Sequence, residues 1–244
     1  MDSTLLKGLT LLELLTQSPV PVGVSALATK LALPKSNVHR TLGTLVSAGY
    51  VRRLENGTYE ASLKVWELGM QVMKRNQLRR AAIAFMHALQ GVTTETVTLV
   101  APDGDDCLYI HQMEASAPLR ISTAAGERAP AVMTISGRVM MAFYADAEHR
   151  AQRLYDAVSP RPPFGLETLL SDLKTIRQNG YAMSGSHWRP GINSMAGVIC
   201  GPDGVPVGAI AVAGSKERFT GEKMQELVQP LLSACANVSR ALGG

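Results

Sequence analysis

The side chains with the clearest chemical potential lie between Lys35 and Ala48, where polar and apolar residues recur at helical spacing. The apolar side of this predicted helix holds Val38, Leu42, Leu45 and Val46. The opposite side carries Lys35, Ser36, Asn37, His39, Arg40 and Thr44. Cationic, amide, imidazole and hydroxyl groups of this kind contact base edges and phosphates in nucleic-acid grooves. The pattern predicts a helix that packs with one side and enters a DNA groove with the other.

The residues around this helix predict how it is held. A short helix capped by Ser25 ends near Leu31, and only a tight turn separates it from the next helix at Pro34. Gly49 then ends that second helix, because glycine tolerates a left-handed backbone. Two short helices with so little between them must cross steeply, as in a helix-turn-helix.

A two-stranded ribbon is predicted next, with strands at 50–54 and 58–60 and an Asn-Gly turn between them. Arg52 and Arg53 lie on its first strand. Taken singly, an amphipathic helix is usually just a solvated helix, and an arginine pair is an ordinary exposed charge. The order of the elements, the short turn and the ribbon together favour a DNA-binding winged helix.

Charge is distributed unevenly along the 244 residues, whose formal net charge is +4. Residues 1–75 hold nine basic and five acidic residues, which accounts for all of that charge, whereas residues 76–244 hold 15 of each. Only the winged segment is therefore expected to meet phosphates. The three cysteines, Cys107, Cys200 and Cys235, show no CxxC spacing, and no signal peptide or membrane-spanning run is evident. We therefore expect a cytoplasmic protein without a structural zinc site.

Domain boundaries follow from changes in the pattern. We expect a winged helix-turn-helix DNA-binding domain at 1–61, a linker helix at 62–77 and an effector-binding domain at 78–244. A first helix from Ser3 to about Thr16 should supply an apolar face to the DNA-binding core through Leu5, Leu9, Leu12 and Leu15. The linker helix carries a Met and Trp stripe, which we interpret as a packing face toward a neighbouring domain or a second subunit.

From Gly91 onward the pattern predicts an α+β domain built around antiparallel hairpins. Strands are expected at 94–101, 107–113, 119–123, 181–184, 194–200 and 207–213. Helices are expected at 136–145, 147–155 and 166–179, followed by a final helix capped by Thr220 and kinked at Pro230. The chain therefore belongs to the α+β class.

Enzymatic function is the main alternative from another class. The sequence lacks GxGxxG, GxSxG, HExxH and phosphate-cradling motifs, and its five histidines lie far apart. Ser194 with His187 could form a nucleophile and base, but no third member or oxyanion site is identified. A purely architectural DNA-binding protein would leave the large neutral domain without a purpose. We expect a regulator that is not an enzyme and needs no cofactor or metal.

Several ordered motifs carry a family resemblance. They are PKSNVHRTLGTLVSAGYV, a hairpin, WELG, and NGYAMSGSHWRPGINSMAGVICGPDGVPVGAIAVAGSKERFT. Across essentially the whole chain, this order resembles the IclR-type bacterial transcription regulators. The resemblance implies a winged helix-turn-helix, a linker helix and a C-terminal effector domain with a GAF-like α+β fold that binds a small metabolite. It also implies dimers, often paired into tetramers, on palindromic operators near catabolic genes.

Within this resemblance, the groove-facing segment of the family corresponds to residues 36–40. Arg40 and Lys35 are expected to contact phosphate or guanine, and Asn37 to read adenine. His39 could do either, or could be a packed helix residue. The wing residues Arg52 and Arg53 are expected to reach backbone phosphates and to add affinity more than sequence preference.

The resemblance also implies an effector pocket against the sheet, beneath the turn at 125–128. The residues expected at this pocket are Ala125, Gly126, Met133, Ser184, Ser194, Ala211 and Ala213. Backbone amides of a glycine-bearing turn can hold a carboxylate, and the strand side chains would shape the rest.

The sequence departs from the family pattern near this pocket. Pro-Ala-Val-Met-Thr replaces Pro-Leu-His-Ala-Thr at 130–134, Ser194 replaces a cysteine, and alanines replace hydroxyls on the last strand. Acids that precede the Pro-Gly in relatives are replaced by His187, Trp188 and Arg189. We therefore predict a carboxylate effector with an apolar or aromatic body. In the alternative interpretation these changes only repack the core, or the three residues at 187–189 serve a subunit interface.

Overall fold

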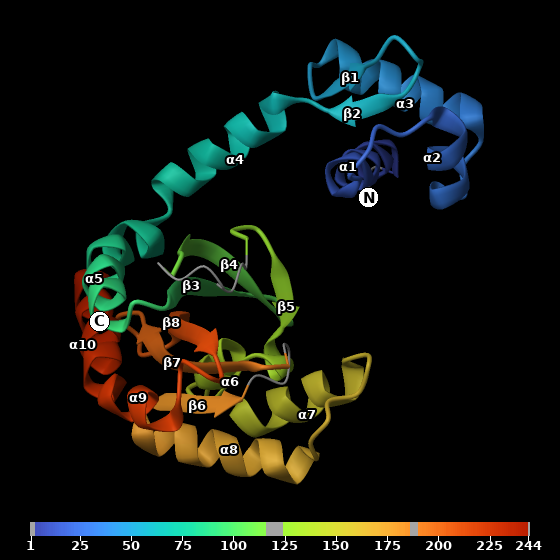
Figure 1. Ribbon diagram of the computed structural model, residues 1–244. Helices are drawn as coiled ribbons and strands as arrows, with labels where there is room; N and C mark the ends of the chain where they lie inside the picture. The colour runs from blue at the N-terminus through green and yellow to red at the C-terminus, as the bar shows by residue number, and fades with distance from the viewer. Residues whose placement is uncertain (1–2, 116–123, 186–189, 244) are drawn as a thin grey trace. The chain divides into compact units, whose positions relative to one another are not determined.

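The computed structural model describes residues 3–115, 124–185 and 190–243, and its chain divides into two compact units, Met1–Arg75 and Asn76–Gly244 (Figure 1). The strand expected at 119–123 lies outside the described residues. None of the helices within the described ranges is long and apolar enough to cross a lipid bilayer. The units are described in turn.

The first unit is a three-helix core with a two-stranded ribbon and a following helix. Its elements are α1 (Ser3–Gln17), α2 (Val24–Leu31), α3 (Lys35–Ser47), β1 (Val51–Arg53), β2 (Tyr59–Ala61) and α4 (Leu63–Arg75). The core between the helices is closed by buried leucines from α1 and α2, by Val38 and Leu42 from α3, and by Tyr59 from the ribbon. This order and packing are those of a winged helix-turn-helix.

The turn between α2 and α3 depends on one left-handed residue. Ala32 has φ 52°, and its amide donates to the Thr29 carbonyl at 3.2 Å. The next amide, of Leu33, donates to the Ala28 carbonyl at 3.0 Å. Pro34 then occupies the N-cap of α3. The tight reversal expected from the sequence is therefore closed by two backbone hydrogen bonds.

One local expectation in this unit was wrong, and another was confirmed only in part. Helix α2 begins after Gly23, which has no side-chain cap, so Ser25 does not cap it. On α1 the predicted Leu15 is buried and Leu12 packs partly against the core, whereas Leu5 and Leu9 are 61% and 50% exposed and Leu11 is buried instead. The part of α1 that faces solvent is therefore as rich in leucine as the part that faces the core.

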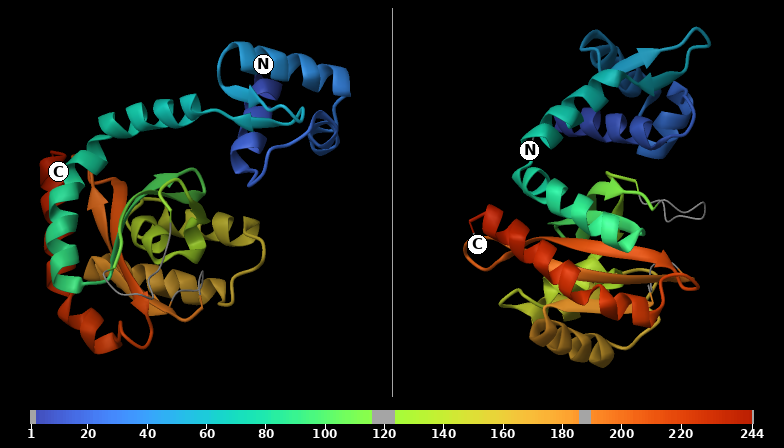
Figure 2. Two further views of the ribbon diagram at one scale, coloured as in Figure 1. Left: turned by 45° about the horizontal axis from the view of Figure 1, so that its top comes forward. Right: turned by 60° about the vertical axis from the view of Figure 1, so that its left-hand side comes forward.

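The second unit is a six-stranded antiparallel sheet with helices on both faces (Figure 2). Its strands are β3 (Thr96–Asp103), β4 (Asp106–Met113), β5 (Arg128–Pro130), β6 (Tyr181–Gly185), β7 (Ile192–Cys200) and β8 (Pro206–Ser215), in the spatial order β5-β4-β3-β8-β7-β6. Its helices are α5 (Gln77–Thr93), the 3-10 helix η1 (Ala131–Met133), α6 (Ile135–Met141), α7 (Ala147–Ala157), α8 (Leu166–Asn179), α9 (Gly221–Glu226) and α10 (Val228–Ala241). This confirms the predicted α+β class.

Helices α5 and α10 pack on one face of this sheet, and α6 packs on the other. The face under α6 has small side chains along the central strands, including Ala196, Ala209 and Ala211. Close approach is also required at Gly137 of α6, where a Cβ atom would lie 2.0 Å from the Ala131 carbonyl oxygen. Small residues therefore let α6 and η1 sit close to one another and to the sheet.

A buried ion pair joins the start of β3 to the segment before α9. The Glu95 carboxylate is fully buried and accepts from Arg218 Nε at 2.7 Å and from the second guanidinium nitrogen at 2.8 Å. Lys223 Nζ lies 4.0 Å from the same carboxylate. Position 214 must be glycine, because a Cβ atom there would lie 2.8 Å from Glu95 Oε2.

The C-terminal helix is divided at Leu227, three residues before the proline that was expected to kink it. Thr220 caps α9 as predicted, its hydroxyl accepting from the Lys223 amide at 3.4 Å. Pro230 then lies in the first turn of α10, where its missing N–H leaves no helical hydrogen bond unmade.

Candidate nucleic-acid interface and effector site

Helix α3 presents a continuous hydrogen-bonding face to solvent. Val38 and Leu42, which are 1% and 0% exposed, fix the buried side of the helix. The opposite side holds the predicted DNA contacts Lys35, Ser36, Asn37, His39, Arg40 and Thr44, all exposed except Asn37, which is half-buried. His39 is therefore not a packed helix residue. The Thr44 hydroxyl donates to the Arg40 carbonyl at 3.3 Å and is partly engaged within its own helix.

The ribbon places its two arginines in different surroundings. Its turn is closed by Asn56, whose side-chain oxygen accepts from the Thr58 amide at 3.1 Å, in agreement with the Asn-Gly signal. The Arg52 guanidinium forms an ion pair with Glu60, the residue opposite it in the ladder. Because successive strand residues point to opposite sides, the exposed Arg53 extends away from this pair. The two predicted phosphate contacts therefore differ in their surroundings, since Arg52 is paired with Glu60 whereas Arg53 shares its side of the ribbon with the buried Val51 and Tyr59.

The first turn of α4 is fastened to the C-terminal end of α3. The Ser62 hydroxyl donates to the Gly49 carbonyl at 2.5 Å, and the Ser62 amide donates to the Tyr50 carbonyl at 2.8 Å. Lys64 Nζ donates to the Ala48 carbonyl at 2.8 Å and lies 4.5 Å from the centre of the Tyr50 ring. A cation at this position also interacts favourably with the negative end of the α3 dipole.

Four of the predicted effector residues lie together in the sheet register. Ser194 pairs with Ser184 on β6 and with Ala213 on β8, so the three strands align at this level. One step along, Ala196 pairs with Ala211. Because cross-strand partners share a face, Ser194, Ala211 and Ala213 lie on the face that α6 covers. Met133, which is 8% exposed, belongs to η1 on that same side.

The turn that contains Ala125 and Gly126 is exposed and leads into β5. Gly126 has φ +96°, and its amide donates to the Tyr109 carbonyl at 2.7 Å. The Glu127 amide donates to the Ala124 carbonyl at 3.0 Å. These two amides are therefore occupied, and a carboxylate at this turn would need other donors. His187, Trp188 and Arg189 lie outside the described residues.

Two buried threonines on β3 lie beside the β8 alanines, and the sequence analysis did not predict them as site residues. Thr96 pairs with Ala213 and Thr98 with Ala211, and these threonines are 0% and 5% exposed. Each therefore places a hydroxyl beside a position where the last strand has alanine. The alternation Thr94-Glu95-Thr96-Val97-Thr98 carries a period-two polar signal inside a strand, which could have indicated them.

The described residues offer little for nucleophilic or metal chemistry. Burial raises the pKa of the Cys107 thiol to about 12, and the pKa of Cys235 is raised to about 12 for the same reason. Both thiols are therefore protonated at neutral pH and are poor nucleophiles. Within the described ranges there is no group of three or more His, Cys, Asp or Glu side chains that could hold a metal ion.

A winged helix-turn-helix with an exposed basic and polar helix face, followed by a separate α+β domain, is the arrangement of a DNA-binding transcription regulator. Family comparison agrees with this class: the IclR helix-turn-helix domain matches residues 4–55, and the bacterial transcriptional regulator IclR C-terminal domain matches residues 70–240. The chain belongs to the IclR family of transcriptional regulators and carries the C-terminal effector domain of that family. Members of this family are regulators and not enzymes.

Individual relatives extend over nearly the whole chain. The HTH-type transcriptional regulator KdgR of Escherichia coli is 30% identical over 227 residues, covering 91% of this chain and 86% of KdgR. The Thermotoga maritima IclR structure covers 100% of both chains with 27% identity and a TM-score of 0.78. An IclR homologue from Microbacterium hydrocarbonoxydans, complexed with 4-hydroxybenzoate, shares the fold at 20% identity and a TM-score of 0.82, covering 98% of this chain and 99% of its own.

Proposed function

We propose that this regulator binds a palindromic operator near catabolic genes as a homodimer or dimer of dimers in the cytoplasm. The observation that carries the DNA part is the exposed basic and polar face of α3 on an otherwise packed helix-turn-helix. Two such helices must lie about 34 Å apart to meet successive major grooves. Arg40 and Lys35 would contact guanine or phosphate, and Asn37 would contact adenine.

The test is a salt titration of the full chain on fragments of its own upstream region, read by fluorescence anisotropy. We expect tight binding to one palindromic segment. Because a homodimer presents Arg40 to both half-sites, Arg40→Ala should remove two bidentate contacts of about 1–3 kcal/mol each and weaken binding by at least about 30-fold. The matched control is Arg80→Ala, which removes an exposed positive charge from α5 in the other unit. Weak binding that is equal on all fragments and insensitive to Arg40 would contradict the proposal.

For the effector domain we propose a small carboxylate with an apolar or aromatic body, bound beside Ser194, Ala211, Ala213 and Met133. The alanines on β8 have small side chains, and Thr98 places a hydroxyl beside Ala211 on the neighbouring strand, so this level of the sheet combines small apolar groups with a hydroxyl. Ser184, Ala125 and Gly126 would complete the boundary of the pocket. The aromatic acid in the Microbacterium relative is of the same chemical class. Division of the chain at 1–61, 62–77 and 78–244 remains part of this proposal.

Calorimetry on the full chain with benzoate, 4-hydroxybenzoate, hexanoate, pyruvate and glyoxylate would test the ligand class. We expect saturation by the larger acids, and Ala211→Leu should abolish it, because the longer side chain would occupy the position proposed for the acid on β8. Saturation by pyruvate or glyoxylate alone would contradict an apolar or aromatic body. A bound acid can change operator affinity only by its unequal affinity for two arrangements, typically through about 1–3 kcal/mol of coupling.

A further inference from the structure

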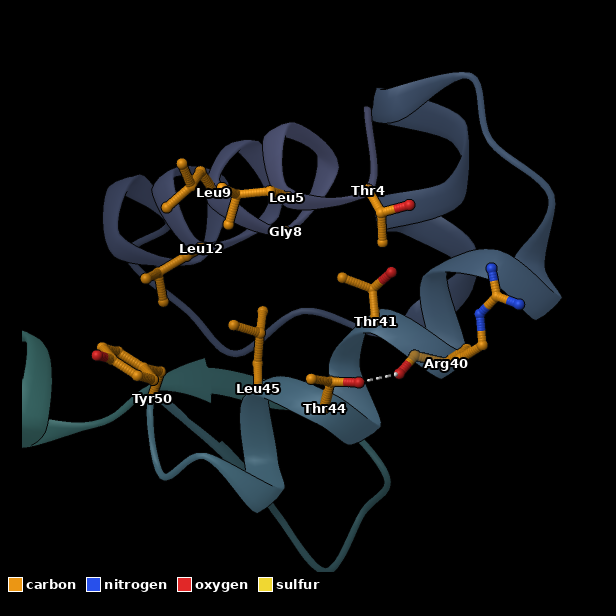
Figure 3. A pocket seen from close by; sticks show the side chains of 10 residues that line it. All are labelled: Thr4, Leu5, Gly8, Leu9, Leu12, Arg40, Thr41, Thr44, Leu45 and Tyr50. Atoms are coloured by element: carbon orange, nitrogen blue, oxygen red, sulfur yellow. Dashed lines mark hydrogen bonds between the residues drawn. The ribbon is translucent and has the colours of Figure 1, made fainter. Parts of the chain in front are cut away.

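Arginines border cavities in both units, but their guanidinium groups differ in their access to water. In the first unit, Arg40 lies at one end of a groove of about 550 Å³ between α1 and α3, with its guanidinium directed away from the leucines of the groove (Figure 3). Arg40 is exposed, so water can solvate its charge. In the second unit, Arg138 lines a cavity of about 300 Å³, and only 3% of its side chain is exposed. A charge held away from water must be satisfied by the protein or by a ligand.

Two contacts fix the plane of the Arg138 guanidinium. Its Nε donates to the Val132 carbonyl of η1 at 3.1 Å. Its central carbon lies 4.1 Å from the centre of the Phe164 ring, which covers one face of the group. Phe164 is itself held in place, because its carbonyl accepts from the Tyr155 hydroxyl at 2.8 Å. These contacts use Nε and one face of the guanidinium, and they leave the two terminal nitrogens for other partners.

The two terminal nitrogens of Arg138 have different partners. One donates to the Asp172 carboxylate of α8 at 3.1 Å. The other is buried and has no hydrogen-bond partner within the described residues. A carboxylate that accepts from both terminal nitrogens at once forms a stronger and more directional pair than a single bond does. The pair with Asp172 is therefore incomplete, and it leaves a buried donor that a second oxyanion could satisfy.

The partners in this ion pair also differ in how easily each can leave it. The Asp172 side chain is 44% exposed, whereas the Arg138 side chain is 3% exposed. Asp172 can turn into water and recover its hydration, but Arg138 cannot follow it. The cation is thus the fixed member of the pair, and the acid is the member that a ligand can replace.

The cavity beside this pair has the character of a small ligand site. It lies between α6, α8 and the edge strand β6, and it shares no residue with the effector site proposed on the sheet. Thr175 and Asn179 lie on its exposed α8 side. Apolar surface comes from Ile135, Ile176, Ala182 and Met183. A few polar groups that converge on an otherwise apolar hollow are typical of small-molecule sites.

We propose that this α6–α8 cavity is a second ligand site, which takes a small aliphatic carboxylate bound to both terminal nitrogens of Arg138 in place of Asp172. Asp172 then acts as a competitor built into the chain, so the site fills only when the acid is abundant. A neutral amide of the same shape should not bind, because it cannot replace the charge of Asp172. The site goes beyond the proposed function and does not depend on it.

A fluorine label at the cavity tests the proposal locally. Asn179→Cys is introduced into the full chain with Cys200→Ser, and the new thiol is labelled with a trifluoromethyl reagent. The remaining thiols of Cys107 and Cys235 are buried and protonated at neutral pH, so they should not react. We expect isobutyrate to shift the fluorine NMR signal saturably and isobutyramide to leave it unchanged. A label at Gln178→Cys, exposed on α8 but not lining the cavity, should respond little.

Asp172→Asn in the labelled chain removes the internal competitor. It should lower the apparent dissociation constant for isobutyrate by at least about 10-fold, because the acid no longer displaces or repels a carboxylate. The matched control is Glu148→Gln, which makes the same change in net charge at an exposed pair with Lys174 and should leave the constant unchanged. Arg138→Met should remove the response.

Three results would overturn the proposal. They are no saturable shift in the Asp172→Asn chain, equal shifts with isobutyrate and isobutyramide, and equal dissociation constants in the Asp172→Asn and Glu148→Gln chains. If Arg138→Met fails to fold, the comparison of these two surface variants still decides. The label reports on this cavity alone, so a negative result leaves the calorimetric and anisotropy tests of the proposed function unaffected.

Discussion

Replacement of Glu95 by glutamine should lower the free energy of unfolding of the C-terminal unit by about 3 kcal/mol. The Glu95 carboxylate is fully buried and both of its oxygens accept from Arg218. A glutamine keeps the volume but turns one acceptor into a donor that faces the guanidinium. Removal of one partner of a buried ion pair costs about 3–5 kcal/mol, and the lower end applies because the Arg218 side chain is 34% exposed and keeps part of its hydration.

Urea unfolding of the full chain, followed by far-ultraviolet circular dichroism, measures this loss. With a slope of about 2 kcal/mol/M, a loss of about 3 kcal/mol moves the midpoint of the second-unit transition by about 1.5 M. The matched control is Glu148→Gln, which removes a pair with Lys174 whose side chains are 68% and 71% exposed. Exposed pairs contribute less than about 1 kcal/mol, so this midpoint should barely move. Equal shifts in the two variants would refute the argument from burial.

Three further outcomes are expected. Gln71→Pro, on the polar side of α4, should break the helix and abolish the effect of a bound acid on operator affinity, while acid binding measured by calorimetry persists. The control Gln71→Ala should keep the response, and a response kept by the proline variant would refute transmission through α4. Gly137→Ala should destabilise the second unit by at least about 2 kcal/mol through its clash with the Ala131 carbonyl, whereas Gly43→Ala, with nothing within 4 Å, should stabilise its helix by about 0.5–1 kcal/mol in the same urea assay. The Cys107 and Cys235 thiols ionise near pH 9 in the unfolded chain, whereas burial raises their pKa to about 12 in the folded protein. The free energy of unfolding should therefore be unaffected below pH 9 and fall above it by up to about 1.4 kcal/mol per pH unit for each thiol. Cys235→Ala should reduce that slope, and an unchanged slope would contradict the burial argument.

The order of helices and strands was largely predictable because each segment has its own hydrophobic periodicity and is bounded by glycine, proline or capping residues. Helix α8 has the predicted bounds, with Gly180 in the left-handed conformation at its C-cap. The buried side of α3 likewise follows from Val38 and Leu42. In α1, by contrast, leucines occur around most of the helix, so periodicity correctly placed Leu15 in the core but could not choose between Leu9 and Leu11.

Long-range pairing explains most of what was missed at the candidate sites. The row that joins Thr96 and Thr98 to β8 depends on register between strands more than 100 residues apart in sequence. The ion pair of Glu95 with Arg218 has the same origin, since nothing local identifies either as the other's partner. Arg52 and Glu60 are only eight residues apart, yet their ion pair was not predicted, because it depends on the register between β1 and β2.

The hydrogen bonds of Ser62 and Lys64 to the end of α3 join α3 and α4, so we expect these two helices to move together. At 1.5 Å per residue, α4 is about 20 Å long, so a tilt of the helix by about 10° about one end moves its other end by about 3 Å. Because Ser62 and Lys64 tie the DNA end of α4 to α3, we expect any bending to be concentrated at Asn76, which leaves helical geometry with ψ 111° and caps α5. Amide hydrogen exchange should therefore be slow at Ser62 and fast at Asn76. A stiff joint at the DNA-binding end and a break in the helix at Asn76 would together concentrate bending at the effector end of the linker.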